Sequence, residues 1–121
     1  MATVELTTDN FDEIATAEGI VLLDFWAGWC VPCRMFGPVY ERVSERHPDI
    51  VFGKVDTEAQ PELASDFQIS SVPTLFAVRD GIVLHARSGA LPEAGLEDLV
   101  RRIRAVDMAA VHRQVAGEAA A

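Results

Sequence analysis

The feature that most constrains the fold is a dense apolar run over residues 20–27, which ends just before both cysteines of the chain. A run of this kind is typical of a β-strand that is buried on both faces. Such a strand needs helices on either side of its sheet, which predicts an α/β layer fold. Helical periodicity then begins at or near Cys30, so Cys30 and Cys33 lie in the first turn of a predicted helix.

The spacing of the two cysteines favours reversible disulfide chemistry. Residues three apart on a helix have Cβ atoms about 5–6 Å apart, and a disulfide requires Cα atoms within roughly 4.4–6.8 Å of each other. Cys30 is predicted to have a lowered thiol pKa and to be the nucleophile, because free N–H groups and the helix dipole stabilise an anion at a helix N-terminus. Cys33, one turn further on, is expected to be more buried and to react second.

A structural disulfide, a zinc site and a chance pairing are weaker interpretations of the two cysteines. A structural disulfide that closes so short a loop contributes only about 2 kcal/mol in the chain-entropy model. A zinc site needs more ligands, and the three histidines are far apart in the sequence, at positions 47, 85 and 112. Two unrelated core cysteines would not account for the flanking Trp29 and Pro32. A redox-active dithiol is therefore the favoured interpretation.

Length and charge exclude several classes of protein. A chain of 121 residues is the length of one domain, and no stretch is long enough to span a membrane. The net charge of −9 argues against binding to nucleic acid or to anionic membranes. The N-terminal residues lack the basic and apolar parts of a signal peptide, and a lone Cys-x-x-Cys pair suits a reducing compartment. We therefore expect a cytoplasmic protein.

Periodicity and turn signals predict an alternation of strands and helices. Strands are expected at residues 3–6, 20–27, 50–55, 74–79 and 82–88, and helices at about 30–47, 58–67 and 92–105, with a further helix that is capped by Thr8 and ended by Gly19. Pro38 should kink the long helix, and Asp80-Gly81 predicts a two-residue hairpin turn. Crossover connections followed by a hairpin imply a mixed sheet with helices on both faces.

The residues around the cysteines resemble the active-site signature of the thioredoxin family. Residues 24–34 read Asp-Phe-Trp-Ala-x-Trp-Cys-x-Pro-Cys-Arg, and the similarity continues through Pro38, Asp56, residues 72–74 and residues 89–90. It covers roughly residues 3–106 and implies the thioredoxin fold, with a central five-stranded mixed sheet. One position differs, because thioredoxins typically have glycine where this chain has Val31.

The resemblance implies a protein-disulfide reductase. Cys30 would attack a disulfide in a protein substrate and Cys33 would resolve the mixed disulfide. The chain would be a monomer that needs no cofactor beyond this redox-active disulfide, and an NADPH-dependent thioredoxin reductase would supply its electrons. An oxidant or isomerase is an alternative, because the residues between the cysteines, here Val31 and Pro32, tune the reduction potential. A non-redox binding or chaperone module is a second alternative, against which the retained cysteines argue.

Asp24 interrupts the apolar strand, where an unpaired charge is costly to bury. Lys54, in a strand that is expected to lie alongside, is a candidate partner. A satisfied buried ion pair would account for Asp24 without a function. The resemblance favours instead a proton acceptor near Cys33, with a raised carboxyl pKa.

The resemblance also implies a rim of apolar residues around Cys30. In thioredoxins the proline that corresponds to Pro73 follows a cis peptide bond and packs against the active-site disulfide, so we expect a cis bond between Val72 and Pro73. Trp26 would support the site from below, and Arg34 would add positive potential. The residues expected to contact substrates are Trp29, Val31, Pro32, Val72, Pro73, Gly89 and Ala90.

The chain is expected to divide into a thioredoxin domain, residues 1–106, and a C-terminal extension, residues 107–121. Apolar side chains and His112 recur at near-helical spacing from Met108 to Val115, which predicts a short helix. Residues 117–121 are expected to form a frayed tail. We expect this extension to pack on the surface, and a helix that docks a partner is the alternative.

Overall fold

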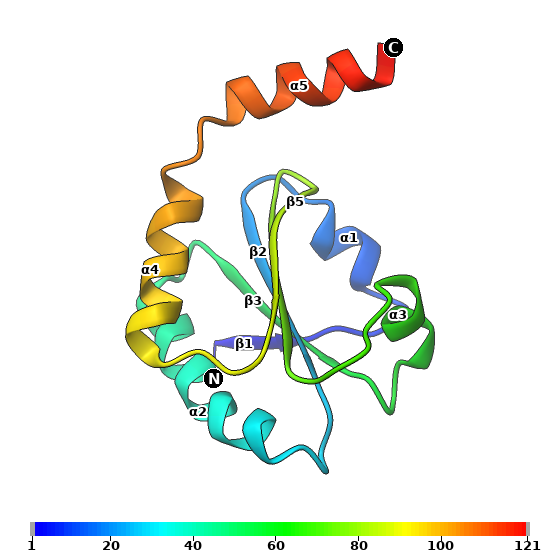
Figure 1. The fold of residues 1–121 in the computed structure, drawn as a ribbon, viewed down its shortest axis with the longest axis vertical. Coiled ribbons are helices and arrows are strands. Elements are labelled where there is room, and N and C mark those ends of the chain that lie inside the picture. Colours follow the sequence, from blue (N-terminus) through cyan, green and yellow to red (C-terminus); the bar gives the residue numbers. More distant parts are fainter. Residues whose placement is uncertain (1, 121) are drawn as a thin grey trace.

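Five strands form one mixed sheet in the computed structural model, which describes residues 2–120. The strands are β1 (Thr3–Glu5), β2 (Ile20–Trp26), β3 (Val51–Asp56), β4 (Thr74–Arg79) and β5 (Ile82–Ser88). Their order is β1-β3-β2-β4-β5, with β1, β3 and β2 parallel and β4 and β5 antiparallel to their neighbours (Figure 1). The predicted mixed sheet is confirmed.

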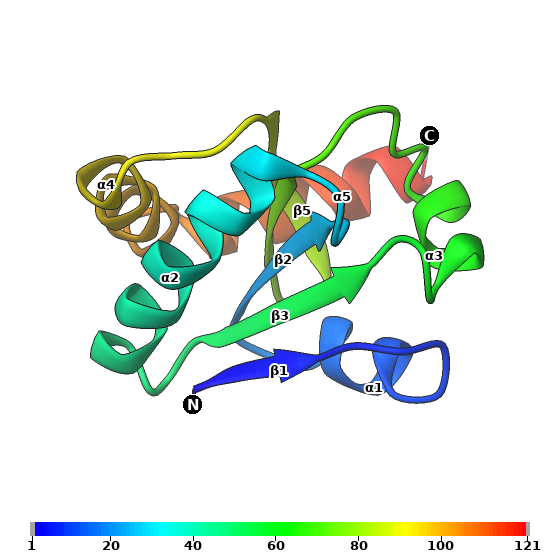
Figure 2. The ribbon, with the colours of Figure 1, turned by 90° about the horizontal axis from the view of Figure 1, so that it is seen from below.

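Helices cover both faces of this sheet, as expected (Figure 2). They are α1 (Phe11–Ala15), α2 (Val31–Arg46), α3 (Pro61–Asp66), α4 (Glu93–Arg104) and α5 (Met108–Ala120). α2 and α4 pack on one face, and α1 and α3 on the other. Among residues 2–120, none of these helices is long and apolar enough to cross a bilayer.

The central strand β2 is buried on both faces, which accounts for its continuous apolar sequence. Ile20 and Leu22 pack against the core under α2 and α4. Val21, Leu23 and Phe25 belong to the second core, under α1 and α3. Because side chains alternate along a strand, Asp24 points to the same face as Leu22, beneath α2.

The first helix is shorter than its sequence predicted. It begins at Phe11 after Asn10, so Thr8 as its N-cap is wrong. The side-chain oxygen of Asn10 accepts a hydrogen bond of 2.7 Å from the backbone N–H of Thr7, which folds the preceding residues into a turn. The helix ends at Ala15, and Gly19, with φ of 95°, lies in the turn before β2 instead of ending the helix.

Two other turns are determined by individual residues. The carboxylate of Asp56 accepts hydrogen bonds from the backbone N–H groups of Glu58 and Ala59, so α3 starts at Pro61 and not at Glu58 as predicted. The predicted hairpin turn at Asp80-Gly81 is confirmed, and both residues have positive φ, as a two-residue turn of type I′ requires.

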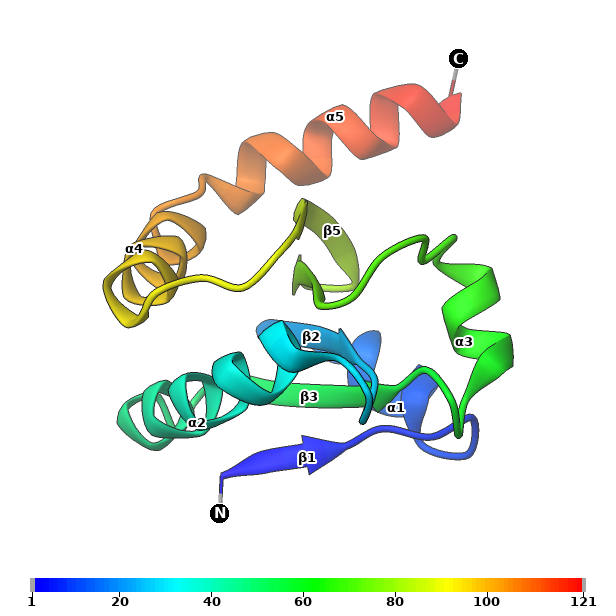
Figure 3. The same cartoon turned by 60° about the horizontal axis from the view of Figure 1, so that its bottom comes forward.

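The predicted C-terminal helix is present as α5 but is longer than expected. It runs from Met108 to Ala120, so a frayed tail over residues 117–120 is wrong, and residue 121 lies outside the described residues. The alanine-rich sequence favours helix enough to offset the cost of Gly117, about 1 kcal/mol. α5 leaves the end of α4 and lies outside the helix and sheet layers (Figure 3).

Candidate active site

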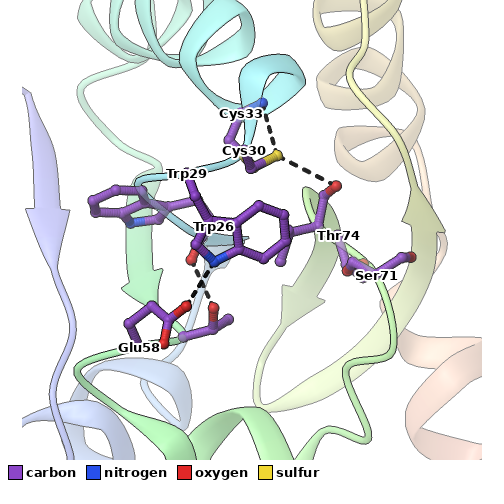
Figure 4. The surroundings of a disulfide bond; sticks show 9 residues. Trp26, Trp29, Cys30, Cys33, Glu58, Ser71 and Thr74 are labelled. Carbon is purple, nitrogen blue, oxygen red and sulfur yellow. Dashed lines mark hydrogen bonds between the residues drawn. A yellow bond between two sulfur atoms is a disulfide. The ribbon is translucent and has the colours of Figure 1, made fainter.

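The end of β2 and the start of α2 position the two cysteines. Cys30 is the N-cap residue of α2, and it forms a disulfide with Cys33, with their Cα atoms 5.3 Å apart. The backbone N–H of Cys33 donates to Sγ of Cys30 over 3.2 Å (Figure 4). The sulfur thus takes the place of the oxygen acceptor that usually caps a helix, and the first helical turn begins at Cys30 as predicted.

Both cysteines are buried, with 3% of Cys30 and 5% of Cys33 exposed. The expectation that Cys33 is the more buried of the two is therefore wrong. The physical reason is the loop before β4, which covers Cys30 and brings the carbonyl oxygen of Val72 to 3.5 Å from its Sγ. A disulfide sulfur carries no proton, so this contact becomes a hydrogen bond only in the protonated thiol.

The loop before β4 is held in place by hydrogen bonds on both sides of Pro73. The Val72–Pro73 peptide bond is cis, as predicted. The backbone N–H of Gly89 donates to the carbonyl oxygen of Pro73 over 2.8 Å, and the hydroxyl of Thr74 donates to the carbonyl oxygen of Ser71 over 2.6 Å. These bonds fix the segment whose Val72 carbonyl oxygen contacts the sulfur of Cys30.

Most residues of the expected rim are exposed around the disulfide. The exposed members are Trp29, Val31, Pro32, Gly89 and Ala90, whereas Val72 is half-buried and Pro73 is buried. Trp29 has 68% of its surface exposed. An apolar surface of this kind beside a reactive sulfur is suited to contact a polypeptide chain.

Glu58 is a neighbour of the site that the sequence analysis did not identify. Its carboxylate accepts a hydrogen bond of 2.6 Å from Nε1 of Trp29 (Figure 4). Glu58 follows β3, and Trp29 follows β2, and these strands are parallel neighbours. Their carboxyl ends meet at the same edge of the sheet, and that shared edge was the signal in the sequence that could have placed Glu58 there.

Asp24 is almost fully buried, with 1% of its surface exposed, and its carboxyl oxygen Oδ1 has no hydrogen-bond partner among the described residues. Burial raises the pKa of this carboxyl to about 7, and the positive charge of Lys54 opposes the rise. Asp24 and Cys33 line the same cavity, of about 400 Å³. The predicted rise in the carboxyl pKa is confirmed.

Lys54 lies beside Asp24 without forming an ion pair with it. The two residues are opposite each other in the β2–β3 register. The ammonium group of Lys54 lies instead over the ring of Trp26, 5.0 Å from its centroid, where a cation–π interaction stabilises it. An ion pair between Asp24 and Lys54 is therefore wrong for this structure, although the charge of Lys54 still acts on the carboxyl.

Trp26 and Arg34 also line this cavity. Trp26 is half-buried and packs against the buried cluster of Ala27, Cys30 and Cys33, which is the supporting position expected for it. Arg34 is exposed on α2. Within residues 2–120, no group of three or more histidine, cysteine or acidic side chains is arranged to hold a metal ion.

The comparison with known proteins identifies the family. The profile of the thioredoxin family matches residues 2–102. The chain belongs to the thioredoxin family. A relative from Streptomyces coelicolor, named "Putative thioredoxin 2", is 56% identical over 98% of this chain and 89% of its own. The thioredoxin of Bacillus subtilis is 38% identical over 84% of this chain and 98% of its own.

The fold and the activity agree with this family. The crystal structure of a Malassezia sympodialis thioredoxin superposes with a TM-score of 0.75 at 29% identity, over 84% of this chain and 91% of the other. The chain has the predicted thioredoxin fold. It is a thioredoxin-type dithiol–disulfide oxidoreductase, a protein-disulfide reductase whose redox pair is Cys30 and Cys33 and whose substrates are protein disulfides.

Proposed function

We propose that Cys30 is the nucleophile and Cys33 the resolving thiol of this reductase. The observation that carries this assignment is the position of Cys30 as N-cap of a 16-residue helix, with the N–H of Cys33 aimed at its sulfur. The helix dipole and this donor stabilise a thiolate at Cys30. The position of Cys33, one turn inside the helix, provides no comparable set of free N–H groups.

The reaction then proceeds by two exchanges of sulfur. The Cys30 thiolate attacks one sulfur of the substrate disulfide, forms a mixed disulfide and releases the other substrate sulfur as a thiolate, which takes up a proton. The Cys33 thiol loses its proton and attacks Sγ of Cys30. This step forms the Cys30–Cys33 disulfide and releases the second substrate thiol. Two electrons and two protons pass to the substrate in each cycle.

We assign Asp24 the role of proton acceptor for Cys33. The two side chains line one cavity, which can hold a water molecule between them. A carboxyl whose pKa is about 7 is well matched to general base catalysis near neutral pH. Lys54 is then a charge that moderates the basicity of Asp24.

The exposed rim would bind the substrate chain. Trp29, Val31 and Pro32 would contact it beside the cysteines, and Val72 and Pro73 from the loop before β4, where the carbonyl oxygen of Val72 lies 3.5 Å from Sγ of Cys30. An extended peptide that lies between them could pair with the backbone of Val72, as in β-strand addition. Gly89 and Ala90 would contact one end of this peptide.

The electron balance implies one further partner, and the net charge disfavours two classes of partner. Each cycle consumes two electrons, so a separate NADPH-dependent thioredoxin reductase would regenerate the dithiol. We propose that the protein acts as a cytoplasmic monomer. The net charge of −9 disfavours nucleic acid and anionic membranes as partners.

Reduction of insulin disulfides tests the assignment of the two cysteines. The Cys33→Ser variant should accumulate a mixed disulfide through Cys30, whereas Cys30→Ser should form none and should lose turnover. A Cys30→Ser variant that still reduces insulin, or that traps substrate through Cys33, would show that the roles are reversed. If a variant that lacks both cysteines still supported the cellular function of the protein in full, the binding-module alternative would be favoured.

An equilibrium titration against glutathione separates a reductant from an oxidant or isomerase. A reductant should have a potential below roughly −240 mV, the level of a cytosolic glutathione pool. A potential near that of an isomerase, about −180 mV, would replace the reductase with the alternative activity.

A further inference from the structure

We propose that Glu5 is a positioning residue of the active site, which draws the ammonium group of Lys54 away from Asp24 and so keeps that carboxyl the stronger proton acceptor. This inference rests on the proposed role of Asp24. Glu5 lies on the edge strand β1, outside the sequence signature around the cysteines.

The strand register places the three charged residues in one row. Glu5 on β1 is opposite Lys54 on β3, and Lys54 is opposite Asp24 on β2. Residues opposite one another in neighbouring parallel strands point to the same face of the sheet. In this row Lys54 therefore lies between Asp24, which is buried, and Glu5, which is exposed.

Lys54 also borders two cavities, which share Thr3, Trp26 and Lys54 in their linings. The first, of about 400 Å³, is lined by Asp24, Cys33, Trp26 and Lys54, among others. The second, also of about 400 Å³, is lined by Thr3, Glu5, Trp26, Lys54 and Asp56. The ammonium group lies over the ring of Trp26, which borders both cavities, and each cavity adjoins one of the two acids, Asp24 or Glu5.

The other charged groups around Lys54 are already engaged or lie on α2. The carboxylate of Asp56 accepts from two backbone N–H groups. Glu41 on α2 accepts from the hydroxyl of Thr3 over 2.6 Å and from the backbone N–H of Ala2, and Arg34 on α2 is exposed. Within residues 2–120, the carboxylate of Glu5 accepts no hydrogen bond and forms no ion pair, so it is free to turn toward Lys54, whereas the carboxylate of Asp56 is held by its backbone partners.

The sign of the effect follows from electrostatics. A positive charge near Asp24 favours the ionised carboxylate and lowers its proton affinity. When Glu5 attracts the ammonium group outward, Asp24 loses part of this influence and binds its proton more tightly. The Glu5→Gln variant should therefore lower the titration midpoint of Asp24 by about half a pH unit, the size that a solvent-exposed ion pair produces.

The experiment follows the carboxyl carbon of Asp24 by ¹³C NMR across pH 4–9 in the full oxidised chain. The expected midpoint is lower in Glu5→Gln than in the wild type, and the difference should shrink at 1 M salt, because exposed charges are screened. Glu45→Gln is the matched control, since Glu45 is an exposed acid on α2 that lines neither cavity. It should leave the midpoint unchanged.

A double-mutant cycle tests whether Glu5 acts through Lys54. In a Lys54→Gln background, Glu5→Gln should have little further effect on the Asp24 midpoint. An unchanged or raised Asp24 midpoint in Glu5→Gln would overturn the proposal. An equal shift with and without Lys54 would also overturn it, because the charge of Glu5 would then act on Asp24 directly.

The kinetic readout separates this inference from the role of Asp24. The pH midpoint of mixed-disulfide resolution should fall in Glu5→Gln together with the NMR midpoint. If only the NMR midpoint falls, Glu5 positions the charge as proposed and Asp24 is not the proton acceptor. If Asp24→Asn slows resolution but Glu5→Gln leaves both midpoints in place, the role of Asp24 holds and that of Glu5 is overturned.

Discussion

At the scale of single residues, the fold withdraws from water a carboxyl group that lines the same cavity as Cys33. The pKa of Asp24 is about 7 in the folded protein and near 3.8 without burial. The folded state therefore binds a proton more tightly than the unfolded state does. The contribution of Asp24 to stability is most favourable below about pH 4, declines as pH rises toward 7, and stays low above that pH.

The Asp24→Asn variant should accordingly be more stable than the wild type at pH 8, by roughly 2 to 4 kcal/mol. The advantage should vanish below about pH 3, where the wild-type carboxyl is protonated in both states. Urea unfolding at several pH values measures this difference. Carboxylates with lowered pKa values, such as Asp49, weaken both proteins in acid and cancel in the comparison. A stability difference that does not change with pH would contradict the assigned pKa.

Val31 is the residue of the motif that departs from the family resemblance. It is the first residue of α2 and 55% exposed, so Val31→Gly should leave the core intact. Removing the β-branched side chain frees the first turn, which carries the N–H groups near the sulfurs. The reduction potential should move by about 10 to 20 mV, or roughly 0.5 to 1 kcal/mol. Equilibration with glutathione measures it, and an unchanged potential would show that Val31 does not tune the pair.

The sequence predicted the chemistry of individual residues better than their contacts. An acidic residue inside an apolar strand is easy to recognise in the sequence, because burying its charge costs free energy. Asp24 is buried as expected. The position of the Lys54 ammonium was not predictable, because its side chain has four flexible torsions and the ring of Trp26 competes with Asp24. Glu5 was missed because its register with Lys54 exists only once β1 has paired with β3.

At the scale of elements, one arginine joins β4 to the end of α4. Nη1 of Arg79 donates to the carbonyl oxygens of Ile103, Arg104 and Val106, at 2.9, 3.3 and 3.3 Å. The last carbonyl groups of a helix lack partners within the helix, and a cation there also interacts favourably with the helix dipole. Arg79 therefore links α4 to the strand that follows the cis peptide bond.

The Arg79→Met variant should lose about 1 to 2 kcal/mol of stability, because it removes charge-assisted hydrogen bonds while keeping an apolar side chain of similar length. Arg87→Met is the matched control. Arg87 lies exposed on β5 and forms no ion pair within residues 2–120, so its loss should change stability by less than about 0.5 kcal/mol. Equal losses in the two variants would show that the contact with α4 contributes nothing specific.

Helix starts were the elements least accessible from the sequence. Thr8 has a side chain suited to cap a helix, yet Asn10 folds a turn that delays the helix to Phe11. Asp56 has the same effect before α3. In both cases a polar side chain bonds to nearby backbone and competes with the helix. The long helix α2 was predicted well because its apolar periodicity extends over sixteen residues.

At the scale of the whole molecule, the order of strands and helices was sufficient to predict the layers of the fold. Parallel strands require crossover helices, and these connections are right-handed, which leaves few arrangements for the remaining segments. α5 could not be placed in this way, because it follows the last strand and no sheet position depends on it. Its half-buried residues are near its start, at Met108, Ala110 and Val111, and residues 112–119 are exposed.

Deletion of residues 108–121 should leave insulin reduction near the wild-type rate. The dithiol, Asp24 and the loop at Pro73 all lie upstream, and residues 2–102 span the matched family region. α5 contacts the hairpin turn through Nε2 of His112, 3.2 Å from the carboxylate of Asp80, and this pair is exposed.

The deletion should also leave the hairpin turn in place, because Asp80 keeps a second and stronger partner. Its Oδ1 accepts from the backbone N–H of Gly19 over 2.8 Å, and this bond is the larger cause of the lowered pKa of its carboxyl. We expect a loss of at most about 0.5 kcal/mol and a fall of no more than about 2 °C in the melting temperature. The His112→Ala variant in the full chain isolates the contact with Asp80. A truncated protein that stays folded and loses its reductase activity would show instead that α5 takes part in substrate or reductase binding.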